Sequence, residues 1–276
     1  MKNGLYLIYC IFESGGNFPS LLPSGIDGQP VCLVGDNGLS AAVSRVSGSS
    51  GIRPDLPRVL AYENVVETFH RDRTVLPMRY GCLLEGESQV IELLWKHCEE
   101  YRSLLRDLTG CVELGIRILL PIDRPDSPAC AAEHRLSAVL AQAGDPPAAA
   151  RAGAAGRRLW TADSGLREDT PGRAYLEARR ADCAVKERRA LEEAEVAESC
   201  QTAFAGLFVK CKTECLRIAH SAFRAPLLSL YFLVKRESEE SFCQAFRALS
   251  RRESARMMLS GPWPPYNFVP LERQRE

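Results

Sequence analysis

Two apolar runs, one near each end of the chain, constrain the fold more than any other feature. Residues 5–12 (LYLIYCIF) carry no charge, and residues 227–234 (LLSLYFLV) contain a single serine. Short runs that are apolar on both faces and rich in aromatic and branched side chains are typical of central strands. The residues after the first run, ESGG, form a poor signal-peptide cleavage site, which favours a buried first strand. Each run therefore predicts the centre of a sheet.

Hairpin and helix signals follow the first run. Residues 31–34 and 39–46 are expected to be two strands joined by the turn GDNG, whose residues tolerate the positive φ that hairpins require. Apolar residues recur at helical spacing from Val59 to Phe69. A second helix is predicted over residues 88–108, with Ser88 as its N-cap. This mixture of strands and helices predicts an α+β fold class.

The second half of the chain has a different element order. A strand at 111–120 precedes an insertion at about 121–170 that is rich in Pro, Ala and Gly. A long helix, the second apolar strand, another helix and a last strand follow, at about 171–200, 227–234, 238–252 and 256–260. If residues 216–221 supply one more strand, the order is the βαββαβ of a ferredoxin-like fold.

These orders predict two domains in the 276-residue chain. The first is an N-terminal α+β domain at 1–110. The second is a C-terminal ferredoxin-like domain at 111–276, which contains the insertion.

Composition excludes some classes of protein. The 35 basic residues balance 35 acidic ones, which argues against a protein that coats nucleic acid. No apolar run reaches the roughly 18–20 residues of a membrane span, so none is predicted. The 11 cysteines are odd in number and form no C-x-x-C pair, which is typical of reduced cytosolic thiols.

The chain carries no motif of a known catalytic or cofactor site. It has neither phosphate-binding glycine motif and no G-x-S-x-G turn, and its four histidines are dispersed. Cys211 and Cys215 would share one helical turn as half of a zinc site, but too few further ligands lie nearby. We therefore predict no catalytic, cofactor-binding or metal site. An enzyme would have to use a thiol such as Cys82 or Cys111 with His70 or His97 as its base.

The C-terminal segment GPWPPYNF is the most unusual stretch. Its three prolines fix φ and donate no backbone hydrogen bond, so they hold aromatic side chains on a stiff scaffold. Such an element can dock on its own domain or on a partner. The candidate partner-binding residues are Trp263, Tyr266 and Phe268.

At this segment the sequence resembles the gas vesicle protein L/F family (GvpL/GvpF), whose C-terminal signature is similar to SGPWPPYNFV. Four further stretches resemble the family in the same order: VVETFHRDRTVLPMRYG, LTGCVELGIRIL, GRAYLEAR and YFLVKR. Three positions differ from the common pattern, with Tyr80 in place of Phe, Cys82 in place of Thr and Asn267 in place of Ser. The resemblance covers most of the chain outside 121–170.

The resemblance implies a non-enzymatic accessory or assembly protein of gas vesicles in the cytoplasm. It would bind the shell protein A, and other accessory proteins as further candidates, either as a minor vesicle component or as an early assembly factor. The family fold implies two α+β domains, the second a modified ferredoxin-like one. We expect a sheet edge or groove, framed by the aromatic tail, to bind the partner. The alternative is a ferredoxin-like small-molecule-sensing or regulatory protein.

Overall fold

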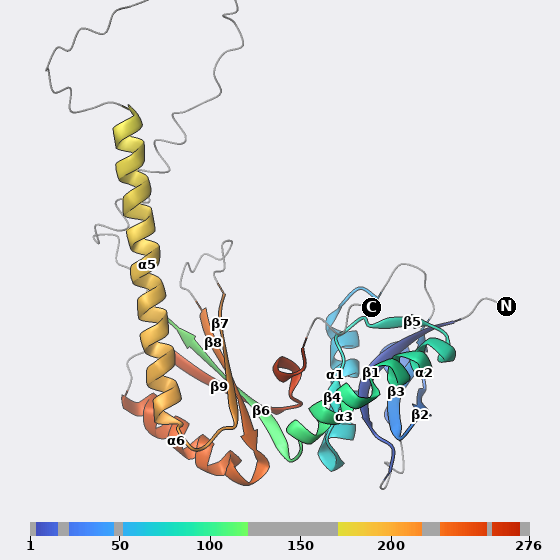
Figure 1. Ribbon diagram of the computed structural model, residues 1–276. Coiled ribbons are helices and arrows are strands. Elements are labelled where there is room, and N and C mark those ends of the chain that lie inside the picture. The colour runs from blue at the N-terminus through green and yellow to red at the C-terminus, as the bar shows by residue number, and fades with distance from the viewer. Residues whose placement is uncertain are drawn as a thin grey trace, which may run out of the picture.

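The computed structural model of the protein describes residues 4–15, 22–46, 52–120, 171–216, 227–252 and 256–270. The insertion expected at 121–170 lies outside these residues, as do residues 217–226. The described elements form two antiparallel sheets with helices packed on them (Figure 1), so the mixed α+β class is confirmed.

The first sheet has the order β2-β3-β1-β4, and β5 also pairs with β1. Its elements are β1 (Leu5–Glu13), β2 (Val31–Asp36), β3 (Leu39–Val46), α1 (Leu56–Asp72), β4 (Leu76–Pro77), β5 (Leu83–Glu85), α2 (Glu87–Lys96) and α3 (Cys98–Asp107). The turn between β2 and β3 has positive φ at Asn37 and Gly38, which confirms the predicted hairpin.

Strand β1 is buried on both faces, as its sequence predicts. A bulge between Ile8 and Cys10 shifts the alternation of its side chains. Ile8 and Ile11 pack with α2 and α3, whereas Tyr9 and Phe12 pack with α1. The first apolar run therefore joins two separate layers of core.

The single helix expected over residues 88–108 is wrong in detail, because the chain bends at His97 into α2 and α3. Gly86, rather than Ser88, is the N-cap of α2. The apolar positions on both sides of the bend, such as Leu94 and Tyr101, pack into the same core. The apolar pattern therefore continues across the bend and does not reveal it.

The second sheet has the order β7-β8-β6-β9. Its elements are β6 (Cys111–Leu119), α5 (Pro171–Ala203), β7 (Lys210–Leu216), β8 (Leu227–Lys235), α6 (Glu239–Arg252) and β9 (Arg256–Trp263). Phe204, Phe232 and Phe242 contact one another in the core between the sheet and its helices, with ring centroids 4.4–5.4 Å apart.

Two strands of this sheet differ from their predicted positions. Strand β7 shares only Leu216 with the range expected at 216–221, of which residues 217–221 lie outside the described part of the chain. The polar residues of KCKTECL, typical of a half-exposed edge strand, concealed it from the sequence pattern. Strand β9 continues past residue 260 to Trp263, where Glu113 of β6 pairs with it. Helix α5 extends well beyond the sheet (Figure 1), but no helix among the described residues is long and apolar enough to cross a bilayer.

The C-terminal strap, residues 261–269, leaves β9 and crosses to the first sheet (Figure 1). Glu113 on β6 is only 4% exposed, and its carboxylate accepts hydrogen bonds from Asn267 N (2.8 Å) and Nδ2 (2.6 Å). Beyond this contact, Phe268 and Val269 pack into the core shared with α2 and α3. The strap thereby ties the two sheets together.

Glycine is required where the strap begins. Gly261 has φ +110°, and a Cβ there would lie 2.7 Å from the Glu113 carbonyl oxygen. A side chain would therefore strain the backbone and push the strap away from β6.

A second contact between the two halves involves the end of α1. Arg236 Nη2 donates to the His70 carbonyl oxygen at 2.6 Å. The His70 ring is buried, and both burial and the Arg236 charge lower its pKa to about 4. The imidazole is therefore neutral at neutral pH.

The buried carboxyl group of Glu113 predicts a pH-dependent stability. Burial raises its pKa above the ordinary 4.5, so ionisation costs the folded state free energy that the unfolded state does not lose. The contribution of Glu113 is thus greatest below pH about 4.5 and falls as the pH rises through its folded pKa. As the pH rises over this window, we expect the unfolding free energy of wild type to fall relative to that of the Glu113→Gln variant. Urea titrations at several pH values measure it, and a constant difference would contradict the prediction.

Candidate partner-binding groove

A groove separates α1 from the strap, and we call it the strap groove. It consists of two hollows that share Glu63 and Tyr266. The inner hollow has a volume of about 310 Å³ and is lined by Val59, Tyr62, Glu63, Pro77, Met78, Arg79, Tyr80, Tyr266 and Asn267. The outer hollow is lined by Leu60, Glu63, Asn64, Glu67, Trp263, Pro264 and Tyr266.

Tyr62 fixes the wall that α1 and the following loop form. Its hydroxyl donates to the Met78 carbonyl oxygen at 2.6 Å and lies 3.0 Å from the Tyr9 carbonyl oxygen. Its ring contacts the Tyr80 ring edge-on, with centroids 5.3 Å apart. The helix begins at Leu56, and the side chain of its N-cap, Asp55, accepts a hydrogen bond from Arg58 N at 2.9 Å. This wall is therefore held rigidly against β1.

Two phenol groups of the inner hollow lack hydrogen-bond partners. The hydroxyl oxygens of Tyr80 and Tyr266 are shielded from solvent and contact no donor or acceptor among the described residues. Burial is the main cause that raises the pKa of both phenols, and the nearby Glu63 carboxylate adds to it at Tyr266. A buried hydroxyl without a partner costs about 1–3 kcal/mol. The described protein groups thus leave both hydroxyl groups without a hydrogen bond.

The charges around the groove are unequally neutralised. On α1, the Glu67 carboxylate pairs with Arg71 at 3.2 Å, and Arg58 pairs with Asp27 and Asp55 at 2.8 and 3.4 Å. Glu63 forms no hydrogen bond or ion pair with any other described residue. Exposed Arg79 lies at the rim of the inner hollow. The inner hollow is therefore lined by one carboxylate without a partner among the described residues and by one guanidinium.

The structure divides the three predicted partner-binding residues. Trp263 is 42% exposed in the outer hollow, and Tyr266 lies between the two hollows. Phe268 instead packs into the core of the first half. Sequence reasoning missed the residues of α1 and the loop, although the stretch VVETFHRDRTVLPMRYG contains several of them. That stretch could have indicated these residues, because it carries part of the resemblance to the family.

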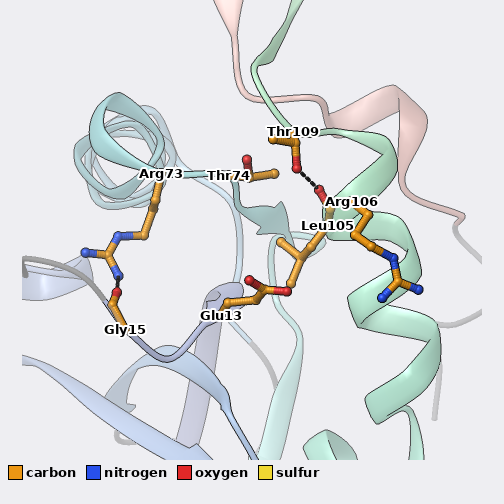
Figure 2. A pocket seen from close by; sticks show the side chains of 7 residues that line it. All are labelled: Glu13, Gly15, Arg73, Thr74, Leu105, Arg106 and Thr109. Atoms are coloured by element: carbon orange, nitrogen blue, oxygen red, sulfur yellow. Dashed lines mark hydrogen bonds between the residues drawn. The ribbon is translucent and has the colours of Figure 1, made fainter.

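Another pocket lies between β1, α1 and α3 (Figure 2), with a volume of about 280 Å³. Arg73 turns to the Gly15 carbonyl oxygen at 3.4 Å and covers the Phe12 ring. The Arg106 guanidinium points away from the pocket, whereas Glu13 points toward its centre (Figure 2). The polar groups therefore do not converge on a common ligand.

The thiols considered as nucleophiles are unsuited to that role. Burial raises the pKa of Cys82 and of Cys111, which disfavours the reactive thiolate. Cys211 and Cys215 lie on strand β7 rather than on one helical turn. Within the described ranges, no group of three or more His, Cys, Asp or Glu side chains is arranged to hold a metal.

These features define an α+β protein with a candidate binding groove. Residues 4–270 match the sequence model of the family described as gas vesicle synthesis protein GvpL/GvpF, so the chain belongs to this family. It is 24% identical to gas vesicle protein L1 of Halobacterium salinarum, over 98% of this chain and 92% of that protein. It is 26% identical to gas vesicle protein F of a Streptomyces strain, over 87% of this chain and 88% of that protein.

Two crystal structures share the fold. GvpF from Anabaena sp. PCC7120 superposes with a TM-score of 0.66 at 17% identity, covering 97% of this chain and 96% of that one. GvpF from Microcystis aeruginosa gives 0.66 at 18% identity, covering 98% and 100%. None of these four relatives carries the name of an enzyme.

Two tyrosines of the inner hollow allow a matched test of its hydrogen bonds. Tyr62→Phe removes the donor to Met78 and should lower the free energy of unfolding by about 1–2 kcal/mol. Tyr80→Phe removes a hydroxyl without a partner and should leave stability unchanged or slightly raised. Urea denaturation followed by circular dichroism measures both. Equal losses in the two variants would contradict this assignment of the bonds.

Proposed function

We propose that this protein is a non-enzymatic assembly factor of gas vesicles that binds the shell protein A through the strap groove. The observation that carries the proposal is the family match along residues 4–270. It is supported by a groove whose outer hollow presents two large apolar side chains, Leu60 and Trp263, which are 54% and 42% exposed. We place its action in the cytoplasm, at the growing gas vesicle, and count other accessory proteins as further partners.

The physical need for such a factor follows from the wall that it helps to build. A shell subunit must expose apolar surface before it joins the wall, and exposed apolar surface aggregates. A protein that covers this surface reversibly keeps the subunit available for assembly. An apolar groove with polar groups at its centre meets this requirement, because its apolar walls supply contact area and its polar groups select the partner.

Trp263 and Tyr266 are the strap residues that we assign to partner contact. Three prolines flank Trp263 and precede Tyr266, at positions 262, 264 and 265, and they restrict this backbone, so little conformational entropy remains to be lost when a partner binds. Phe268 contributes indirectly, by anchoring the strap in the core.

We also propose the domain division at residue 110, where the chain passes from α3 to β6 and from one sheet to the other. The second domain is then a modified ferredoxin-like fold. The element order β6-α5-β7-β8-α6-β9 and the strand order β7-β8-β6-β9 support this assignment. The strap would be its addition to that fold.

Co-expression with shell protein A of the same organism, followed by affinity capture and size-exclusion chromatography, tests the binding. We expect a soluble complex that elutes as one species. Shell protein that aggregates while this chain stays folded and monodisperse would overturn the proposal. Saturable binding of a metabolite without affinity for shell protein would instead support a sensing or regulatory protein.

A pair of tryptophan variants tests the role of the strap. Trp263→Ala should weaken shell-protein binding at least about tenfold, because a large aromatic side chain at the centre of an interface commonly contributes 2 kcal/mol or more. Trp95→Ala is the matched control, since Trp95 is 69% exposed on α2 and does not line the groove. Biolayer interferometry gives both dissociation constants, and melting temperatures check the fold. Unchanged binding by a folded Trp263→Ala protein would exclude the strap from the interface.

A further inference from the structure

Among the groups that line the inner hollow, the Glu63 carboxylate accepts hydrogen bonds only and has no partner among the described residues. The phenol groups of Tyr80 and Tyr266 can both donate and accept. The Asn267 Nδ2 atom donates one of its two hydrogens to Glu113. A ligand that carries positive charge and several donors would complement the Glu63 carboxylate. Among the groups found in proteins, ammonium and guanidinium have that property.

The aromatic lining points to the same kind of ligand. Tyr62, Tyr80 and Tyr266 line the inner hollow together with the apolar side chains of Val59 and Met78. The face of an aromatic ring carries negative charge density, and cations bind in hollows formed by several such rings. The methylene groups of a lysine or arginine side chain would also pack favourably on these walls.

We propose that the inner hollow is a cation site that receives a lysine or arginine side chain of the partner, with the Glu63 carboxylate as its counter-charge. The identity of the partner rests on the proposed function above, whereas the chemistry of the site rests on the hollow alone. Trp263 and Leu60, in the adjoining outer hollow, contact the apolar residues next to that cation. The recognised feature is thus a basic residue within an apolar segment.

The surrounding charges locate the cation at the α1 side of the hollow. Glu63 and Glu67 line the groove from α1, and Glu113 lies on β6 behind Asn267. Arg58 is paired with two aspartates, so it does not compete for Glu63. Arg79 lines the rim on the loop side and repels a second cation there. A neutral or anionic occupant would leave the Glu63 charge without compensation.

A titration with small amines tests the chemistry without any shell protein. The full chain, labelled with ¹³C in its tyrosine rings, is titrated with n-butylammonium, which mimics a lysine side chain, and with 1-butanol as the neutral control. We expect saturable shifts of the Tyr80 and Tyr266 signals with the amine at millimolar concentration, weakened at least tenfold by Glu63→Gln. Equal shifts with 1-butanol, or an unchanged response in the variant, would overturn the proposal.

The matched control is Glu67→Gln, one turn further along α1, since its carboxylate already pairs with Arg71. It should weaken amine binding less than threefold. Glu63→Gln should keep the wild-type melting temperature, because Glu63 bonds to no described residue. If that variant is unstable, Glu63→Asp takes its place. Glu63→Asp keeps the negative charge and should therefore bind the amine with an affinity that falls as salt is added. A folded Glu63→Asp protein that does not bind the amine would contradict the proposed site.

Shell protein A then separates this inference from the proposed function. A cation site that serves recognition predicts at least tenfold weaker capture of shell protein by Glu63→Gln and weaker wild-type binding at high salt. Capture that Glu63→Gln leaves unchanged would overturn the role of the cation site in recognition. Amine binding by wild type without any capture of shell protein would refute the proposed function and leave the cation site standing.

Discussion

The hydrogen bonds between Asn267 and Glu113 are the interaction on which the arrangement of this protein depends. A carboxylate that is only 4% exposed costs free energy unless hydrogen-bond donors compensate it. Asn267 supplies two donors, its backbone N and its side-chain Nδ2. Because backbone and side chain bond together, the strap is fixed in both position and orientation. Tyr266 is thereby held against α1, and the groove exists only while it stays there. A polar contact between the two sheets thus positions one wall of the groove.

The same arrangement explains how one segment serves the fold and the groove at once. The strap turns Phe268 and Val269 into the core and leaves Trp263 half-exposed, so anchoring and presentation fall on different residues. The prolines between them donate no hydrogen bonds, and the strap therefore needs few partners along the groove. The prediction of three equivalent aromatic contacts did not separate these roles, since all three residues are large and apolar.

Strong local signals made much of the fold predictable. The apolar run of β1, the GDNG turn and the spacing along α1 each specify one structure through residues close in sequence. The bend at His97 was not predicted, because the apolar pattern around it is that of one continuous helix. Strand β7 was not predicted, because its half-polar sequence lacks the apolar run of a buried strand. Most of the groove was also not predicted, because residues 59–67 and 77–80 meet residues 263–267 only through the path of the strap. No local pattern records that path.

The position of the strap has a consequence for the order of events during synthesis. One wall of the groove comes from residues 59–67 and the opposite wall from residues 263–267. The ribosome makes the helix wall early, and domains generally fold from the N-terminus as they emerge. The opposite wall reaches its place only after β6 and β9 have paired. On the proposed function, a nascent chain without the strap lacks one wall of the groove, so partner binding would begin only when that wall is in place.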